Sequence, residues 1–266
     1  RSASSRRTSW CHLTSLGIGE ACPLIAEPDT MEALSGIVAW ARREGVEVGI
    51  FGGGTNLVGG DTPDCRLWIR LRRGIFAERR REGVFLIAGA GVALSSILRP
   101  SVRDGFLGAE FAPLSWIPGT VGGAIRMNAG AGCRTIVDLL EDVTVLEMDG
   151  RWRVVAAEEL GAGYRSTALG PDAVVCSARL RIPDIASFPR EEGERALRIH
   201  DKWRREHQPS MASAGSFFRN AGTVSAGRLL DECGLRGHSV GRCGFSRVHA
   251  NFLVAEPGAG ESEVVE

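Results

Sequence analysis

The stretch IFGGGTNLVGGD, residues 50–61, raises the first question about the fold. It holds five glycines in twelve residues and follows directly on an apolar run. Glycine has no side chain, so its backbone can approach another group closely. The two familiar phosphate-binding patterns do not fit, because a dinucleotide fingerprint needs G-x-G-x-x-G opening a helix and a nucleoside-triphosphate loop needs a Lys after its glycines. The stretch therefore indicates a close backbone approach of another kind.

The residues before this stretch predict a helix and then a strand. Apolar side chains at helical spacing run between Asp29 and Gly45, with Asp29 and Glu32 as a capping-box-like start and Gly45 as a stop. Residues 46–51 are then expected to form a short buried strand. The glycine-rich stretch would thus lie at the carboxyl end of a strand, a common position for a ligand in mixed α/β structure.

A second glycine-rich stretch, IPGTVGGA at residues 117–124, leads into MNAG at residues 127–130. Like the first stretch, it combines side-chain donors with bare backbone, an arrangement that binds anions. Two loops of this kind indicate a long ligand with several phosphates or a pyrophosphate. The alternative is that the glycines of either stretch only form tight turns.

The rest of the chain changes character near residue 184. Residues 139–181 alternate between apolar and polar as a sheet does, with a hairpin around Asp149 and Gly150. Charged residues and helix formers follow Pro183, which predicts a boundary and then a smaller α/β unit. Further strands are expected at 67–71, 84–88 and 173–182, and further helices at 94–102, 191–206 and 226–232.

The composition excludes several classes of protein. The 266 residues are 44% hydrophobic, which is enough for one large or two modest domains. Lys plus Arg equals Asp plus Glu at 32 each, so neither nucleic acid nor a membrane surface is expected as a main partner. A local basic site for an anionic small molecule is still allowed. No run of eighteen apolar residues occurs, so no transmembrane helix is expected.

Cysteines and histidines carry no ligand pattern. The seven cysteines are scattered without a C-x-x-C pair, and we expect mostly buried free thiols in a reducing compartment. The five histidines lack the spacing of metal ligands, so no metal site is expected. The Arg- and Ser-rich start RSASSRRTSW has no apolar segment of a secretory signal; we expect a short tail there, the alternative being part of a transit peptide.

Six stretches together carry a resemblance to a known family. They are GGGTNLVGGD, IPGTVGGAIRMNAGA, GYRST, AGSFFRN, SAGRLLDECGLRG and SRVHANFLV. In order and spacing, from about Thr14 to Val254, the chain resembles the UDP-N-acetylenolpyruvoylglucosamine reductase family, also called UDP-N-acetylmuramate dehydrogenases. The resemblance implies an α+β fold, with an FAD-binding domain of the vanillyl-alcohol-oxidase/p-cresol-methylhydroxylase type and a smaller α/β substrate-binding domain. We expect the first at 10–184, with subdomains of about 10–73 and 74–184, and the second at 185–266.

The resemblance also implies an activity. Family members are cytoplasmic flavoprotein oxidoreductases that act on a CH–CH bond in peptidoglycan synthesis, and so serve cell wall biogenesis, cell shape, the cell cycle and cell division. Hydride from NADPH passes through FAD to the enolpyruvyl group of UDP-N-acetylglucosamine-enolpyruvate, giving UDP-N-acetylmuramate. A monomer is expected, with the UDP-sugar and NADPH as partners. The residues expected to bind FAD are Gly52, Gly53, Gly54, Thr55, Asn56, Leu57, Pro118, Gly119, Thr120, Val121, Gly122, Gly123 and Asn128.

Two residues match the family's catalytic positions. Hydride delivery leaves an enolate, which needs fixed positive charge and then a proton. By resemblance, Arg165 in Gly-Tyr-Arg-Ser stabilises the enolate, and Ser216 in AGSFFRN donates the proton, while Tyr164 and Asn220 bind substrate. From the residues alone, a surface Arg beside a packed Tyr is the better explanation of Arg165, and a structural serine is the better explanation of Ser216; the resemblance outweighs both. The rival role of Ser216 as a nucleophile lacks the G-x-S-x-G motif.

The family's third catalytic residue is a glutamate some tens of residues after the H-A-N-F motif. This chain ends at Glu266, fifteen residues after Asn251, and none of its last glutamates lies in the family's motif. The substrate-binding domain is therefore expected to be truncated. Two alternatives to the reductase stay open: a catalytically impaired or non-catalytic homologue that binds FAD or a nucleotide sugar, and an FAD oxidoreductase of the same fold with another substrate.

Overall fold

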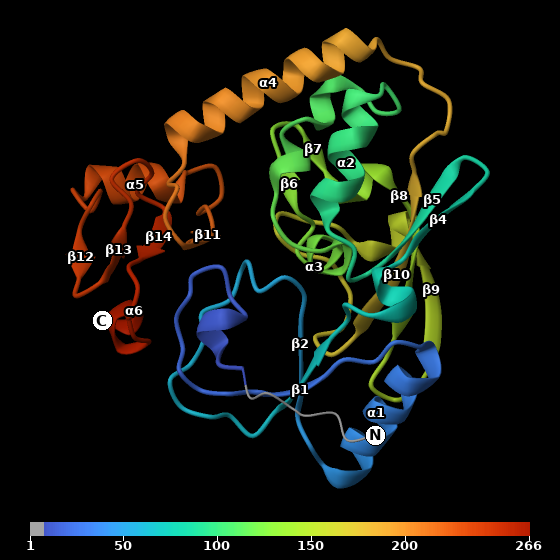
Figure 1. Cartoon of the computed structure of the whole chain (residues 1–266), viewed down its shortest axis with the longest axis horizontal. Helices are drawn as coiled ribbons and strands as arrows, with labels where there is room; N and C mark the ends of the chain where they lie inside the picture. The colour runs from blue at the N-terminus through green and yellow to red at the C-terminus, as the bar shows by residue number, and fades with distance from the viewer. Residues whose placement is uncertain (1–7) are drawn as a thin grey trace. The chain divides into compact units, whose positions relative to one another are not determined.

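The computed structural model describes residues 8–266, and Figure 1 shows the course of the chain. Residues 1–7, where most of the expected N-terminal tail falls, lie outside the described part. The chain folds into two compact units: a larger unit of residues 24–53 and 65–200, and a smaller unit of the residues up to Pro23, 54–64 and 201–266. These units divide the chain elsewhere than at residue 184, so the expected functional boundary there stays a prediction.

The larger unit begins with a parallel sheet in the order β1-β3-β2. Its strands are β1 (Leu24–Ala26), β3 (Leu67–Arg70) and β2 (Val48–Phe51). Helix α1 (Met31–Glu44) connects β1 to β2, as expected. The helix is capped by Thr30, whose hydroxyl accepts from the Ala33 amide, and Gly45 ends it in the left-handed conformation. The glycine-rich stretch therefore follows a strand end, as the sequence predicts.

A second sheet of the larger unit is antiparallel, in the order β4-β5-β10-β8-β9 (Figure 1). Its strands are β4 (Arg79–Glu82), β5 (Phe85–Gly89), β10 (Val174–Arg181), β8 (Leu140–Leu146) and β9 (Trp152–Ala156). The expected hairpin at 149–150 joins β8 to β9. The inward side chains form one apolar core with helices α2 (Leu94–Arg103) and α3 (Val121–Arg126). A short hairpin of β6 (Gly130–Ala131) and β7 (Arg134–Thr135) follows α3.

The second glycine-rich stretch is not the loop that the sequence predicts. It is irregular up to Thr120, and from Val121 onward it is α3. The Val121 side chain is fully buried, and a side chain on Gly122 would come within 2.8 Å of the Ala90 Cβ. Close packing against the end of β5 therefore overrides the weak helix propensity of the two glycines.

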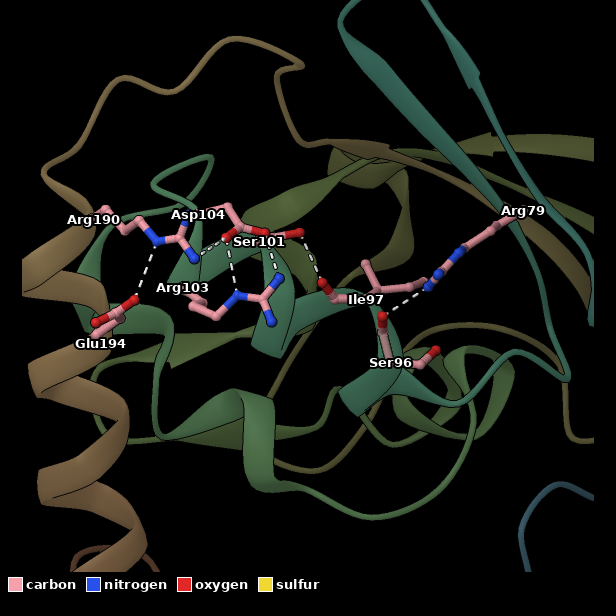
Figure 2. A network of polar contacts seen from close by, with 8 residues as sticks. All are labelled: Arg79, Ser96, Ile97, Ser101, Arg103, Asp104, Arg190 and Glu194. Carbon is pink, nitrogen blue, oxygen red and sulfur yellow. Dashed lines mark hydrogen bonds and ion pairs between the residues drawn. The ribbon is translucent and has the colours of Figure 1, made fainter.

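The long helix α4 (Arg190–His207) begins beside the end of α2. Figure 2 shows the polar contacts there: Arg103 donates to both carboxylate oxygens of Asp104, and the same carboxylate pairs with Arg190. Packing is equally close, since a side chain on Gly193 would lie 2.0 Å from the Val102 carbonyl oxygen. These contacts hold the first turns of α4 within the larger unit.

The smaller unit contains a four-stranded antiparallel sheet in the order β11-β14-β13-β12. Its strands are β11 (Ser213–Ser216), β14 (Phe252–Ala255), β13 (Cys243–Phe245) and β12 (Ser239–Val240). Helix α5 (Ala226–Glu232) lies at its expected position, and α6 (Ser262–Val265) ends the chain. A small core forms where Leu16 and Ile18 pack with side chains of this sheet.

The remaining helical segments are single turns of 3-10 helix. They are η1 (Trp10–His12), η2 (Gly74–Ala77), η3 (Ala109–Phe111), η4 (Leu114–Trp116), η5 (Ile136–Leu139) and η6 (Ala157–Leu160). No helix of residues 8–266 is long and apolar enough to cross a membrane.

The expectation of mostly buried cysteines is wrong, although all seven thiols are free. Only Cys176 and Cys243 are buried, on strands, and burial raises the pKa of Cys176 to about 12. The exposed thiols are Cys22, Cys65, Cys133 and Cys233. They lie outside the strands and helices, where no core covers them.

Candidate functional site

The two glycine-rich stretches meet in the larger unit. A side chain on Gly52 would place its Cβ 2.4 Å from Oγ1 of Thr120. Only a bare backbone fits at this position, because such a distance is far shorter than van der Waals contact. Gly119 has a φ of 110°, a conformation that favours glycine. Gly52 and Thr120, 68 positions apart in the sequence, thus form one continuous surface of backbone and hydroxyl groups.

Other glycines of the first stretch are explained by packing within the smaller unit. Gly54 has a φ of 66°, and a side chain there would lie 2.0 Å from the Leu13 carbonyl oxygen. A side chain on Gly59 would lie 2.3 Å from the Ile18 carbonyl oxygen. For these two positions the alternative of a tight chain approach holds, and no ligand is needed to explain them.

Three of the amides expected to contact a ligand, all at the start of α3, already form hydrogen bonds within the fold. The Val121 amide donates to the Val92 carbonyl oxygen, and the Gly122 amide donates to that of Ala90. The Thr120 hydroxyl accepts from the Gly123 amide as the helix cap. Val121, Gly122 and Gly123 therefore serve the fold through their amides, and the cofactor role expected of them stays a prediction.

Asn128 supplies a polar group that the fold leaves open. The Asn128 side chain is buried, and its Nδ2 donates to the Gly163 carbonyl oxygen at 2.9 Å. The backbone of Asn128 has a φ of 37°. Its Oδ1 atom is buried and has no hydrogen-bond partner among the described residues. An orphaned buried acceptor costs about 1–3 kcal/mol, which an arriving donor would recover. The open acceptor of Asn128 and the bare backbone at Gly52 therefore fit a bound group that carries hydrogen-bond donors. FAD is such a group.

Arg165 lies at the tip of a tight turn in the larger unit. Gly163 and Ser166 bond to each other in both directions, N–H to carbonyl, at 3.0 and 3.4 Å. Arg165 takes a φ of 54°, a left-handed conformation that costs a non-glycine residue about 1–3 kcal/mol. Strain of this size, held by its surroundings, is typical of functional residues.

A cross-link between two segments holds this turn. Nη2 of Arg165 donates to the Gly130 carbonyl oxygen at 2.9 Å, while Asn128 donates to the Gly163 carbonyl oxygen. The guanidinium also lies 5.6 Å from the centroid of the Tyr164 ring. Tyr164 is 57% exposed, so it is not the packed Tyr of the alternative explanation, and Arg165 is half-buried.

Ser216 is the last residue of β11 in the smaller unit. It pairs with Phe252 of β14, and the glycine before it, Gly215, has a φ of 78°. Its side chain is exposed, as are those of Phe217 and Phe218, whose rings meet edge to face at 5.1 Å. Among the described residues its hydroxyl makes no hydrogen bond to a histidine or carboxylate. A base-activated nucleophile therefore has no support here.

Asn220 is exposed, but its amide already takes part in the fold. Its Oδ1 atom accepts from the Ala226 amide, at the start of α5, at 3.0 Å. The substrate-binding role expected of Asn220 stays a prediction, as does that of Tyr164.

The sequence analysis gave Asn251 no role, although it lies in the H-A-N-F motif. Asn251 is buried and bonds through its side chain to both backbone groups of Phe218, two residues beyond Ser216. The signal available in the sequence was a single amide side chain directly before the apolar run FLVA.

Comparisons with known proteins agree with this geometry. A profile of the FAD binding domain matches residues 22–156, and a profile of the UDP-N-acetylenolpyruvoylglucosamine reductase C-terminal domain matches residues 207–266. The chain is 36% identical to the UDP-N-acetylenolpyruvoylglucosamine reductase of Gloeobacter violaceus over 259 residues, covering 95% of this chain and 84% of the relative. The reductase of Heliobacterium modesticaldum is 35% identical over 264 residues, covering 98% and 80%.

A solved structure extends the likeness to the whole fold. The UDP-N-acetylenolpyruvylglucosamine reductase of Thermus caldophilus matches with a TM-score of 0.83 at 35% identity, covering 97% of this chain and 90% of that one. Together these matches confirm the expected fold class, an FAD-binding domain with a smaller C-terminal domain. The chain belongs to the UDP-N-acetylenolpyruvoylglucosamine reductase family.

Proposed function

We propose that this chain reduces the enolpyruvyl double bond of UDP-N-acetylglucosamine-enolpyruvate to give UDP-N-acetylmuramate. The observation that carries the proposal is the strained Arg165 turn, cross-linked by hydrogen bonds to residues 128–130. The names of the relatives support the substrate class. The reaction adds one hydride and one proton across the carbon–carbon double bond, and this chain's residues must serve both additions.

FAD fits the residues of the larger unit. Gly52 and Gly53 offer bare backbone, Thr120 lies beside Gly52, and Asn128 offers a buried acceptor. FAD held by these residues would supply hydride transfer from NADPH to the substrate's double bond. Thr55, Asn56 and Leu57 stay expected contacts from the sequence alone.

Arg165 supplies fixed positive charge for the enolate. A guanidinium is always protonated and presents a planar fork of donors, which suits an enolate and its carboxylate better than a Lys ammonium does. Because one donor is already committed to Gly130, the group has little freedom left to lose on binding. The strained backbone of Arg165, at φ 54°, thus sets the direction in which the guanidinium points.

Ser216 supplies the proton. A serine hydroxyl is a weak acid in water, so it transfers its proton only to a strongly basic acceptor such as an enolate carbon. Its exposed position at the end of β11 leaves the hydroxyl accessible to a substrate. The neighbouring Phe217 and Phe218 can shield that proton from water once substrate covers them.

The proposal extends to the setting of the enzyme. The chain works as a cytoplasmic monomer on soluble nucleotide-sugar and nicotinamide substrates, without nucleic acid or membrane. The balance of 32 basic and 32 acidic residues supports the absence of nucleic acid and membrane partners. Light scattering of the eluted protein tests the monomer, and a mass of twice the 28.5 kDa chain would contradict it.

One assay tests the reaction. The purified chain is loaded with FAD, and NADPH oxidation is followed with and without UDP-N-acetylglucosamine-enolpyruvate. We expect oxidation to depend on the sugar nucleotide and the product to be heavier by two hydrogens. Protein that binds FAD but oxidises no NADPH with this substrate contradicts the proposal and supports the non-catalytic alternative.

A further inference from the structure

Asn251 is a buried polar side chain whose hydrogen bonds all go to one neighbouring segment. It is 4% exposed and directly precedes β14. Its Nδ2 donates to the Phe218 carbonyl oxygen at 2.9 Å, and its Oδ1 accepts from the Phe218 amide at 2.9 Å. Both polar atoms of the amide are therefore satisfied by a single residue of the opposite segment.

Beyond the last paired residues of β11 and β14, the Asn251 side chain takes the place of a paired strand. The β11–β14 pairing ends at Ser216 and Phe252. Beyond it, the Phe217 amide donates to the Asn251 carbonyl oxygen at 2.8 Å, and the Asn251 side chain then pairs with Phe218 as a peptide group would. The backbone stays fixed for two residues past Ser216, where a paired strand is no longer present.

The segment needs such support on the far side of Ser216. On the near side, Gly215 takes a φ of 78°, and the register of β11 shifts between Ser213 and Ser216. Glycine adopts this conformation without strain and has no side chain to fix the backbone by packing. The side-chain contact from Asn251 to Phe218 therefore supplies, after Ser216, the fixing that Gly215 cannot supply before it.

Asn251 is itself held in place. Its backbone amide donates to Nδ1 of His249 at 3.2 Å, and the His249 ring packs edge on against Phe252 at 4.9 Å. Burial lowers the pKa of His249, which favours the neutral ring that can accept this hydrogen bond. Other residues of the H-A-N-F motif thus hold Asn251 in place.

We propose that Asn251 is a positioning residue that fixes the Ser216 hydroxyl for proton transfer. This inference rests on the proposed function, since it requires Ser216 to be the proton donor. Proton transfer depends steeply on the distance and direction of the donor, and a displacement of about 1 Å can lower a rate on the order of 100-fold. Asn251 acts through the backbone and touches no reacting atom.

The first test compares Asn251→Ala with the isosteric Asn251→Asp. Both should lower kcat by roughly 100-fold and change KM for the sugar nucleotide by less than about 3-fold. Ser246→Ala is the matched control, because Ser246 is also buried in this unit and its hydroxyl accepts, within residues 8–266, a single hydrogen bond from the Val248 amide. An unchanged kcat in both Asn251 variants would overturn the inference.

A second measurement separates positioning from general loss of structure. Combined with Ser216→Ala, Asn251→Ala should lower kcat no further, because the residue acts through Ser216. A full additional 100-fold loss in the double variant would overturn the inference.

Amide hydrogen exchange gives a readout without catalysis. In the full chain without ligands, Asn251→Ala should speed exchange at Phe218 and leave β13 protected. Unchanged exchange at Phe218 would overturn the inference. Failure of the proposed function looks different: the wild-type chain itself would then not reduce the enolpyruvyl substrate.

Discussion

Two buried asparagines, one in each unit, do similar work in different ways. Asn251 in the smaller unit bonds to Phe218 through both atoms of its amide. Asn128 in the larger unit bonds to Gly163 through Nδ2 alone, and its Oδ1 stays without a partner among the described residues. The first contact is complete within the protein. The second is half complete, which indicates that Asn128 serves a bound group as well as the fold.

The segments around Arg165 and Ser216 also differ in which residues take the left-handed backbone conformation. At the Arg165 turn the left-handed conformation falls on Arg165 and Asn128, which are not glycines. Beside Ser216 it falls on Gly215, where it carries no strain. Arg165 thus lies in a strained turn that is cross-linked to Gly130, whereas the segment after Ser216 is held by the side chain of Asn251.

Replacing Arg165 by Lys tests the role of the strained turn. The charge is kept, but the planar fork and the bond to Gly130 are lost. We expect kcat to fall on the order of 10²–10³-fold with FAD affinity unchanged, measured by steady-state kinetics and flavin titration. A variant with the wild-type rate would remove Arg165 from the mechanism.

Replacing Asn128 by Ala tests the half-complete contact. The turn loses its bond at Gly163, and a ligand loses the open acceptor. FAD affinity should therefore fall by roughly 10-fold, together with kcat, whereas Asn251→Ala should leave FAD affinity unchanged. Flavin titration measures the FAD affinity of both variants. Equal FAD affinities would contradict a difference between Asn128 and Asn251 in cofactor binding.

Replacing Gly52 by Ala tests the meeting of the two glycine-rich stretches. The new Cβ would lie 2.4 Å from Oγ1 of Thr120, so the free energy of unfolding should fall by about 1–3 kcal/mol. Gly36→Ala in α1 is the control, since no atom lies within 4 Å of its Cβ position. Urea unfolding that shows equal stability for both variants would argue against this packing.

The smallest effect is expected at the Asp104 network of Figure 2. Hydrogen bonds from Arg103 lower the pKa of Asp104, so its contribution to stability is present at neutral pH and is lost as the pH falls through the lowered pKa. Asp104→Asn should reduce Tm at neutral pH by at most about 2 °C and have no effect in strong acid. A difference that persists in acid would rule out this ionic origin.

Much of the fold could be predicted from the sequence because its signals are local. Helix α5 lies at its predicted residues, and the β8–β9 hairpin turns where expected. Helix α1 ends at Gly45 as predicted, but Thr30 caps its start in place of the expected Asp29. Helix α3 could not be predicted, since contacts with Ala90 and Val92 outweigh its two glycines. Strand β4 was missed because its sequence, RRRE, is charged and fully exposed, and only pairing with β5 makes it a strand.

The site divides in the same way. The motifs identify Arg165 and Ser216, but the cross-link from Gly130 to Arg165 spans 35 residues and leaves no local pattern. The side-chain hydrogen bonds between Asn251 and Phe218 join residues that are 33 positions apart. Such contacts arise from the tertiary fold, so local motifs point to the candidate residues Arg165 and Ser216 but not to the contacts that hold them.

One measurement tests the central claim most directly, that Arg165 is held in place to stabilise the enolate. The holoenzyme is first reduced with NADPH and then mixed rapidly with UDP-N-acetylglucosamine-enolpyruvate while the visible flavin absorbance is followed. We expect Arg165→Lys to slow only this second half of the reaction and to leave reduction by NADPH at the wild-type rate. Wild-type rates in both halves, or equal slowing of both, would contradict it.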